Sequence, residues 1–314
     1  MALTLNTFTT GSAIGNREDL ADVIYRISPT QTPVLSAAAK AKATAITHEW
    51  QTQDLAAASP TGSIVTEGAD ASTKTVTPTV RLGNRCQINS KSISVSGTQT
   101  AVNPAGRKDE LAYQLAMISL EIKRDMESGI LQNDTVGSAP NKARGLRGWV
   151  VDNTSVGAGY VAPSAYTGTA TTATTDGTQR AFTEALLKAT LQAVFNAGGD
   201  PDMIIVPPNQ KQTFSTFTGN ATRFDKSEDA KLYASVDVYV SDFGELSVMP
   251  DRFFRAANRE AFVLQTDKLA IAYLRPFTTF ELATTGDAQN RQVVVEWTVE
   301  CRAPKAHAAI YDLS

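Results

Sequence analysis

The chain has 314 residues, of which 42% are hydrophobic, an ordinary content for a globular protein that excludes disorder along the whole chain. Its 29 basic and 32 acidic residues leave a net charge of −3, so no overall electrostatic attraction to nucleic acid is expected. No run approaches the roughly 18 consecutive apolar residues that a membrane span needs.

The two cysteines, Cys86 and Cys301, are far apart, and neither belongs to a CxxC motif or a Cys/His cluster. This spacing argues against a metal or redox site and predicts two reduced thiols of a cytosolic protein. No basic residue precedes Arg17, and the first residues lack a continuous apolar core, so no secretory signal is expected.

Residues 1–45 are expected to form an extended arm. Residues 16–19 resemble a helix capping box with Asp in place of Glu, and they predict a short helix that stops before Pro29. The Ala-rich residues 34–45 follow. The arm holds too little apolar material to fold alone, so we expect it to lie on its own subunit or on a neighbour.

Residues 46–96 predict a long β-hairpin. Four segments have strand-like patterns: residues 46–50, 76–80, 85–88 and 91–95. The stretch between the first two is polar, with small residues and the acidic side chains of Glu67 and Asp70. Pro78 favours an edge position, because proline cannot donate to a strand ladder. A lone hairpin is marginal in water, so this long one is expected to pair with another surface in an assembly.

Residues 103–133 are predicted to form one long helix, the spine of the chain. Asn103 is a favoured N-cap and Pro104 suits the first helical position. One face carries apolar residues at helical spacing: Leu111, Leu115, Ile118, Ile122 and Met126. Roughly the opposite side carries Tyr113, Met117, Leu120 and Leu131. A helix that is apolar on two opposed sides is expected to be sandwiched between other elements.

Residues 140–275 predict one mixed α/β domain, which begins with Gly-, Ser-, Thr- and Ala-rich loops. Its expected elements are helices at residues 182–195 and 210–217, and strands at residues 203–206, 236–240, 246–249, 262–264 and 269–274.

Residues 293–301 give the clearest strand pattern in the chain. One side of this strand carries Val293, Val295, Trp297, Val299 and Cys301, and the other carries Glu296, Thr298 and Glu300. Residues 277–282 are its predicted hairpin partner, and residues 306–311 are a last strand. We expect this sheet to pack on the spine face that contains Ile118, through Val295 and Trp297.

No catalytic, metal or cofactor site is predicted. His48 and His307 lie on separate predicted strands, so both are interpreted as surface or packing residues. Asp200 and Asp202 flank Pro201 after two glycines, which is typical of a turn between a helix and a strand rather than a metal pair. The sequence contains no P-loop, zinc-protease or serine-hydrolase motif.

Arg144 and Arg147 lie among glycines beside Trp149. Arginine can bind a phosphate or a carboxylate through its planar guanidinium. With one aromatic residue and no extended basic stripe nearby, a contact with a neighbouring subunit is favoured over nucleic-acid binding. We therefore interpret Arg144, Arg147 and Trp149 as assembly contacts.

Short stretches spread over nearly the whole chain occur in the order found in one protein family: residues 15–22, 27–33, 49–51 with 55–56, 67–69, 274–276, and 296–298 with Ala306. Through them the chain resembles the major capsid proteins of tailed bacteriophages, which have the Hong Kong 97-type fold, and in particular the branch of the phage SU-ten capsid protein. Their collinear order carries the resemblance.

The resemblance implies an α+β fold of four parts. These are an N-terminal arm (1–45), an extended loop formed by a long β-hairpin (46–96), a peripheral domain with the spine helix (97–139 and 276–314), and an α/β axial domain (140–275). It also implies a structural protein and not an enzyme. Its copies would form pentamers and hexamers of an icosahedral virion shell around double-stranded DNA, bound without sequence specificity.

The implied partners are further copies of the chain together with portal, scaffolding and decoration proteins, with assembly in the host cytoplasm and no membrane. Some relatives begin with a coiled scaffolding segment, whereas the arm begins at once here, which implies a separate scaffolding protein. An encapsulin-like shell around protein cargo is the alternative reading. An enzyme is a further alternative, but it would need a pocket that no motif indicates. An extracellular adhesin is another, but it would not need a spine helix that is apolar on two opposed sides.

Assembly contacts are further expected at Glu67, Asp70 and Lys74 of the loop and at Tyr113 of the spine. Some relatives cross-link their subunits through a lysine and an asparagine. Nothing around Lys74 marks it as reactive, so no cross-link is expected. The spine side that carries Tyr113, Met117 and Leu120 is expected to meet the arm or the loop of a neighbour.

Overall fold

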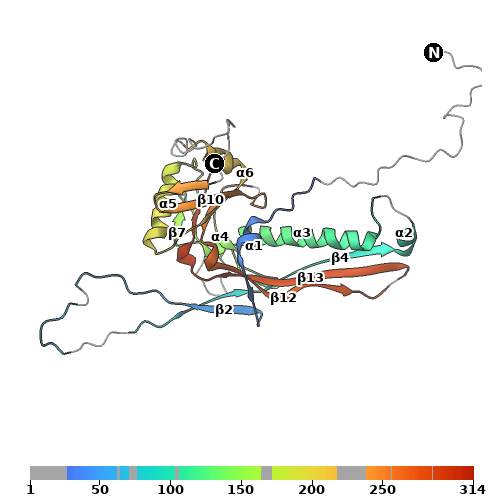
Figure 1. The fold of residues 1–314 in the computed structure, drawn as a ribbon, viewed down its shortest axis with the longest axis horizontal. Coiled ribbons are helices and arrows are strands. Elements are labelled where there is room, and N and C mark those ends of the chain that lie inside the picture. The colour runs from blue at the N-terminus through green and yellow to red at the C-terminus, as the bar shows by residue number, and fades with distance from the viewer. Residues whose placement is uncertain are drawn as a thin grey trace, which may run out of the picture.

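The computed structural model describes residues 27–61, 64–70, 76–102, 106–163, 172–217, 238–255, 257–284 and 286–314. Figure 1 shows an elongated molecule: a compact part lies near one side, a long helix and long strands extend from it, and a narrow loop projects in the other direction. The short helix expected before Pro29 lies outside the described residues, as does Lys74.

The spine is helix α3, Glu110–Gln132. Its N-cap is Asp109, whose carboxylate accepts hydrogen bonds from the backbone N–H groups of Leu111 (2.9 Å) and Ala112 (3.3 Å). The predicted start at Asn103 was therefore too early. The short helix α2, Gly97–Ala101, precedes the spine, and Gly106 between them has a φ of 76°, a left-handed conformation that interrupts a right-handed helix.

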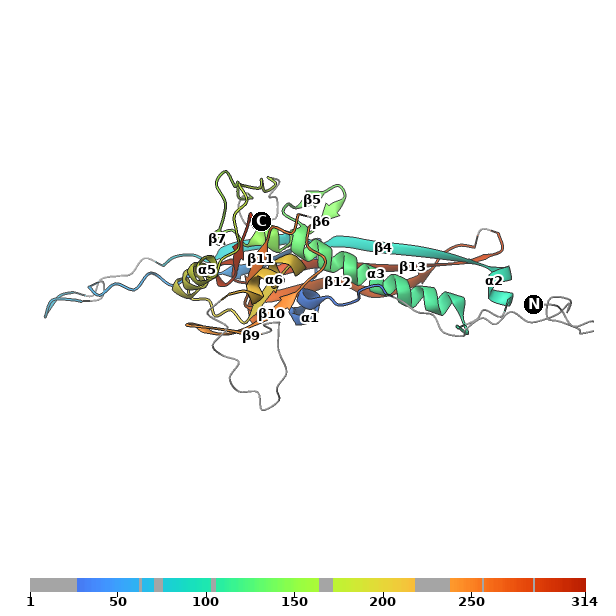
Figure 2. The ribbon, with the colours of Figure 1, turned by 90° about the horizontal axis from the view of Figure 1, so that it is seen from above.

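The spine lies along a four-stranded sheet of order β1-β12-β13-β4 (Figures 1 and 2). Its two longest strands, β12 (Leu269–Glu281) and β13 (Ala288–Cys301), pair antiparallel. The predicted pairing of residues 277–282 with β13 is confirmed for residues 278–281, and β12 extends back to Leu269. The edge strands are β4 (Gln87–Ser96), antiparallel to β13, and β1 (Ala39–Lys42), parallel to β12. The alternating pattern had placed β4 in the projecting hairpin. It belongs to this sheet because its partner is a strand about 200 residues away, which local periodicity cannot indicate.

The first hydrophobic core lies between the spine and this sheet. It contains Ile118, Ile122 and Met126 of α3 together with Val295 and Trp297 of β13, as the face assignment predicted. Burying each such side chain stabilises the fold by about 1.5–3 kcal/mol. Leu131, assigned to the opposite face, is also buried in this core, because the end of α3 is enclosed by helix α4, Leu146–Trp149.

A second sheet, of order β7-β14-β11-β8-β10-β9, forms the compact part. Its strands are β7 (Asn153–Ser155), β8 (Met203–Val206), β9 (Val238–Ser241), β10 (Gly244–Pro250), β11 (Ala261–Leu264) and β14 (Ala308–Ile310). The pairs β8–β10 and β7–β14 are parallel and the other pairs are antiparallel, so the sheet is mixed. The strand predicted at residues 269–274 in this domain belongs instead to β12 of the first sheet. Strand β14 was expected to continue the sheet of β13 and instead pairs with β11 and β7.

Helices α5 (Glu184–Asn196) and α6 (Pro208–Ser215) pack on this sheet and confirm the two predicted helices. Leu187, Leu191 and Val194 of α5 and Phe214 of α6 are buried in a second core against Ile204, Val206, Val263 and Ile310. The remaining elements are the β5 (Gly137–Ser138) and β6 (Asn141–Lys142) ladder and the 3-10 helices η2 (Thr266–Lys268) and η3 (Pro304–Ala306).

The described part of the arm lies on its own chain. Helix α1, Pro33–Ala37, packs against α3 and buries Val34, and β1 follows it at the sheet edge. Cys86 and Cys301 are buried free thiols, as predicted, and burial raises the pKa of Cys86 to about 11. Among the described residues, no helix is long and apolar enough to cross a membrane.

Candidate assembly surfaces

The projecting loop is anchored by a short hairpin. Strands β2 (Thr47–Thr52) and β3 (Val80–Arg85) pair antiparallel, and the described residues between them, 53–61, 64–70 and 76–79, extend away from the body (Figure 1). The indole N–H of Trp50 donates to the carbonyl of Cys301 at 3.0 Å, which ties the base of the hairpin to β13. The loop is thus held at a fixed base while its tip stands free of the subunit.

A buried amide on β3 reinforces that base. The side-chain NH₂ of Asn84 donates to the carbonyls of Arg144 (2.9 Å) and Val299 (2.8 Å), and its Oδ1 accepts from the backbone N–H of Arg144 (2.9 Å). A buried amide that is fully paired in this way fixes the register of the strands around it. The sequence pattern gave no sign of this role, because asparagine is usually a turn residue.

The loop exposes apolar side chains beside acidic ones. Leu55, Ile64, Val65 and Val76 are each more than two-thirds exposed. Glu67 and Asp70, two of the predicted contacts, are also exposed, and Gly68 between them has a φ of 79°, which forms a turn at the tip. Apolar residues held out in water on a narrow loop are typical of a surface that is covered by a partner.

Tyr113, the predicted contact on the spine, is half-buried near the start of α3, and the guanidinium of Arg107 lies 5.5 Å from its ring centroid. Met117 and Leu120 are likewise half-buried. This side of α3 is therefore partly accessible in the subunit, in contrast to the enclosed side of Ile122 and Met126.

Arg144, Arg147 and Trp149 do not lie on a surface. All three are buried inside the chain, which corrects their assignment to a subunit contact. The guanidinium of Arg144 stacks at 5.3 Å from the Trp149 ring, and the Trp149 ring lies 5.3 Å from the Trp50 ring. These residues position the base of the loop from within the subunit.

Arg147 joins two carboxylates inside the chain. Its guanidinium donates to Glu260 (2.8 Å) and to Asp176 (2.6 Å), and Arg255 pairs with the same two carboxylates. Burial opposes the ionisation of Asp176, but hydrogen bonds from Arg255 and Arg147 outweigh it and hold the pKa of Asp176 below its usual value. The cluster pairs its charges internally and is a structural network.

The two histidines occupy unrelated places. His48 Nε2 lies 3.0 Å from a carboxylate oxygen of Glu300 at the base of the loop. His307 is fully buried, and burial lowers its pKa to about 4. Both pack within the fold, as the sequence predicted. Among the described residues, no group of three or more His, Cys, Asp or Glu side chains is arranged to hold a metal ion.

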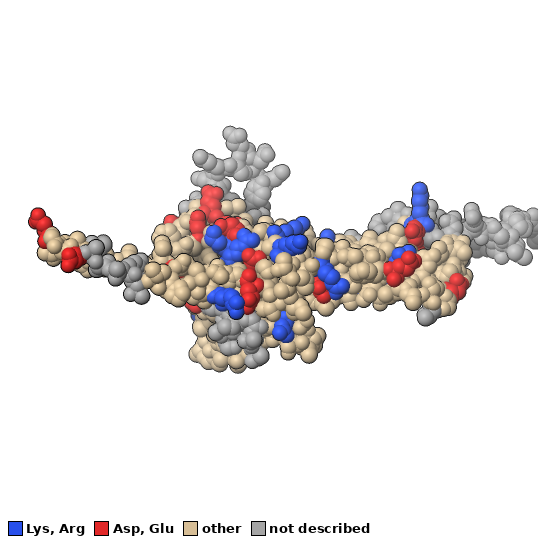
Figure 3. Space-filling view, turned by 90° about the horizontal axis from the view of Figure 1, so that it is seen from below, with Lys and Arg blue, Asp and Glu red and all other residues tan. Residues whose placement is uncertain are grey.

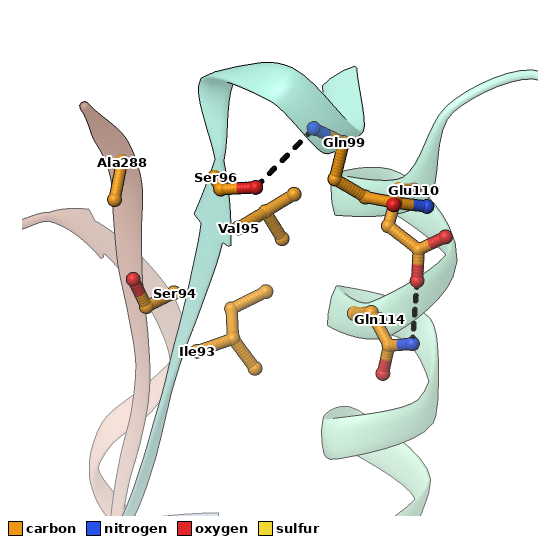
Figure 4. A pocket seen from close by; sticks show the side chains of 8 residues that line it. All are labelled: Ile93, Ser94, Val95, Ser96, Gln99, Glu110, Gln114 and Ala288. Carbon is orange, nitrogen blue, oxygen red and sulfur yellow. Dashed lines mark hydrogen bonds between the residues drawn. The ribbon is translucent and has the colours of Figure 1, made fainter. Parts of the chain in front are cut away.

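A cavity of about 580 Å³ opens between β4, α2 and the first turn of α3 (Figure 4). These elements lie at the end of the molecule far from the second sheet (Figure 1). Ile93 and Val95 form its apolar side, facing Glu110 and Gln114. The Gln114 amide donates to Glu110 at 2.7 Å, and Glu110 also pairs with Arg107. The one carboxylate of this lining is thus already paired, and the lining offers no nucleophile with an adjacent base.

The compact part carries one surface that the sequence did not indicate. Phe195, at the end of α5, stacks on Phe243 with ring centroids 4.8 Å apart and remains more than half exposed, as does Val238. This exposed apolar group lies at the opposite end of the molecule from the cavity.

Comparison with known proteins identifies the family. The model of the SU10 major capsid protein family matches residues 3–314. The chain belongs to this family. It is 27% identical to the major capsid protein of Escherichia phage Phieco32, over 95% of this chain and 94% of the relative.

Solved structures with the same fold include two kinds of shell. A capsid protein of cyanophage A-1(L) superposes with a TM-score of 0.66 at 16% identity, over 97% of this chain and 98% of that one. The SrpI encapsulin of Synechococcus elongatus superposes with a TM-score of 0.59 at 11% identity, over 96% and 93%. The chain therefore has the Hong Kong 97-type fold, and its family is one of phage capsid proteins rather than of enzymes.

Proposed function

We propose that many copies of this chain assemble as pentamers and hexamers of an icosahedral phage head that encloses double-stranded DNA. The observation that carries the proposal is the projecting loop, residues 53–79, which exposes Leu55, Ile64, Val65 and Val76 away from the subunit. An arrangement that leaves apolar side chains in water is stabilised when a neighbour covers them. Closed shells repeat one such contact many times.

The loop is proposed to lie over the spine region of a neighbouring subunit, with Glu67, Asp70, Lys74 and Tyr113 near the contact. Glu67 and Asp70 are exposed, and Tyr113 is half-buried, so all three are accessible to a partner. Exposed ion pairs contribute only about 0–1 kcal/mol each, so the contact is expected to depend mainly on its apolar side chains.

The surface charge is consistent with a shell that encloses DNA without sequence-specific binding. Figure 3 shows basic and acidic side chains interspersed on the face seen from below, rather than gathered into a basic stripe. Together with the net charge of −3, this agrees with weak, non-specific contact to packaged DNA. Portal, scaffolding and decoration proteins are proposed partners of the assembled head in the host cytoplasm.

An encapsulin-like compartment that encloses protein cargo is the second candidate, favoured by the structural similarity to the SrpI encapsulin. The contents of purified particles distinguish the two. Nuclease-protected DNA of genome length supports the phage head, whereas particles that contain a defined protein and no such DNA support the compartment.

Deletion of residues 59–73 tests the role of the loop. We expect a folded subunit that fails to build shells, because the base of the hairpin remains and the contact tip is lost. Size-exclusion chromatography and circular dichroism report assembly and folding separately. The double variant Ile64→Asp/Val65→Asp is expected to fold and to fail in assembly, as the deletion does. The matched control Ile64→Thr/Val65→Thr is expected to retain substantial assembly. Normal shells from the deletion would rule out the proposed loop contact.

A further inference from the structure

One pocket of the subunit lies beside the arm helix. It has a volume of about 530 Å³ and opens between α1, β1, α3 and β12. Leu35 of α1 and Tyr273 and Phe277 of β12 form its apolar lining, and all three are only partly buried. Lys40 of β1 and Lys123 of α3 are its charged residues, and both are exposed. The pocket therefore offers an apolar surface bordered by two positive charges.

The positive charges of the two lysines are not neutralised within the described part of the chain. Neither Lys40 nor Lys123 forms an ion pair with a carboxylate there, and the lining of the pocket contains no Asp or Glu. Lys42 lies two residues after Lys40, on the same side of β1, and adds a third exposed positive charge. Such a pocket is suited to a segment that carries both carboxylates and apolar side chains, because complementary charge favours binding.

Two other cavities differ from this pocket in charge. The cavity of about 580 Å³ beside α2 contains Glu110 in its lining. A third cavity, of about 380 Å³ at the base of the loop, is lined by Asp54 and Asp152, and its Lys305 is already paired with Asp54. Carboxylates in these two linings would repel an acidic segment, so the pocket beside α1 is the better acceptor for one.

The arm helix forms one side of this pocket and is held in a fixed position by the spine. Glu127, in the middle of α3, is fully buried. Its two carboxylate oxygens accept hydrogen bonds from the backbone N–H groups of Val34 at 2.7 Å and Leu35 at 2.8 Å. These N–H groups lie in the first turn of α1, which the side chain of Thr32 does not cap. The lining that α1 contributes is therefore already in place in the single subunit.

The loop tip, residues 64–70, carries the complementary side chains. Ile64 and Val65 are 72% and 71% exposed, and Glu67 and Asp70 are exposed as well. Neither of these two carboxylates forms an ion pair with another described residue. The tip thus places two apolar and two acidic side chains close together in the sequence, which matches the apolar lining and the two lysines of the pocket.

A turn gives the loop tip a defined shape. The backbone N–H of Ala69 donates to the carbonyl of Thr66 at 3.0 Å, and Gly68 has the positive φ, 79°, that the third residue of a type II turn requires. Glu67 is the second residue of this turn. A segment that is ordered before it binds loses less conformational entropy on binding, so the turn favours docking of the tip.

The tip stands apart from the pocket of its own subunit. Figures 1 and 2 show the loop extending away from the body, whereas α1 lies beside α3. We propose that the pocket receives the loop tip of a neighbouring copy of the chain, with the two apolar side chains of the tip against the apolar lining and its two carboxylates beside Lys40 and Lys123. The inference rests on the proposed function, because it assigns the assembling loop to one site and makes the neighbour's arm helix part of the contact.

Reversal of the charges on each side tests the contact in the full-length chain. One variant is Lys40→Glu/Lys123→Glu and the other is Glu67→Lys/Asp70→Lys. Each is expected to raise the subunit concentration needed for assembly, measured by light scattering, by at least about tenfold, because like charges then face each other. The variant with all four substitutions is expected to return to within about threefold of wild type, since opposite charges meet again.

A matched control separates pairing from net charge. Glu67→Lys/Asp70→Lys combined with Lys188→Glu/Lys268→Glu keeps the net charge of −3, but its new carboxylates lie on α5 and η2, outside the pocket. This control is expected to remain at least about tenfold above wild type. Recovery of assembly in the control, or no recovery in the variant that reverses both the tip and the pocket, would overturn the assignment of the pocket.

Disulfide trapping measures the same contact without relying on closed shells. The native thiols of Cys86 and Cys301 are buried, so introduced cysteines dominate the reaction. Glu67→Cys/Lys123→Cys is expected to form at least about ten times more inter-subunit disulfide than Glu67→Cys/Gln99→Cys, whose second cysteine lines the cavity beside α2.

The outcomes of trapping distinguish the pocket from the proposed function. Equal cross-linking of the two variants, or none in either, would overturn the pocket, and wild-type shells in the same experiment would leave the proposed function standing. Selective cross-linking at Lys123→Cys without any wild-type shells would support the pocket and count against the phage head.

Discussion

Arg147 places a positive charge where the fold excludes water. Its guanidinium is 3% exposed and pairs with Glu260, which is 2% exposed, and with the more accessible Asp176. Burial raises the pKa of Glu260, and the two guanidinium groups of Arg147 and Arg255 oppose that rise. Removing one partner of a buried pair costs much more than the pair contributes, because the remaining charge keeps its desolvation penalty.

We therefore expect Arg147→Met to lower the free energy of unfolding by about 3 kcal/mol, measured by urea denaturation of the unassembled subunit. Lys188→Met is the matched control, since Lys188 pairs with Glu184 one turn away on an exposed helix face. Such an exposed pair is screened by water, so its loss is expected to change the free energy of unfolding little. Similar losses in the two variants would show that the Arg147 network is not a buried structural pair.

The positions of the buried charged residues were the hardest to predict from the sequence. Arg147 has partners 29 and 113 residues away, and Glu127 contacts amides 93 and 92 residues away. A charged residue is exposed in most proteins, so its type favours a surface position until the distant partner is known. Gly145 and Gly148 allow close packing against Ile130 and Arg144, which the sequence did not indicate.

At the scale of elements, substitutions on the two sides of the spine helix are expected to have different effects. Ile118 is buried in the core shared with Val295 and Trp297, whereas Tyr113 is half-buried. Ile118→Asp is expected to abolish soluble folding, because an unpaired carboxylate cannot be buried in this core without a cost of several kcal/mol. Tyr113→Asp is expected to leave the subunit folded and to impair assembly.

Soluble yield and circular dichroism measure folding of the two spine variants, and sedimentation of assembled particles measures assembly. The reverse outcome, with a folded Ile118→Asp subunit and an unfolded Tyr113→Asp subunit, would overturn this assignment of faces. Tyr113→Phe is the control for the second side, because it removes the hydroxyl and keeps the ring beside Arg107.

Elements with strong local patterns were predicted well. Helix α5 follows directly from helical spacing, and strand β13 from alternation, although residues 293–301 of β13 are buried on both sides. Strands β4 and β14 were found but given the wrong neighbours, since pairing is decided by distant segments. The start of the spine was misjudged because both Asn103 and Asp109 suit an N-cap, and Gly106 decides between them.

At the scale of the whole molecule, the subunit leaves apolar side chains uncovered on its projecting parts. The loop extends beyond the body in one direction and the spine with its sheet in the other (Figure 1). Leu55 and Val76 on the loop, and Phe195 on the compact part, leave apolar surface uncovered at separate places. These exposed residues are where we propose that copies of the chain meet.

Electron microscopy of the purified full-length chain under assembly conditions tests the central claim most directly. We predict uniform closed shells whose reconstruction contains capsomers of five and of six subunits, with each loop seated on the spine region of a neighbour. Discrete small oligomers, with no closed particles at any concentration or salt condition tested, would contradict the account.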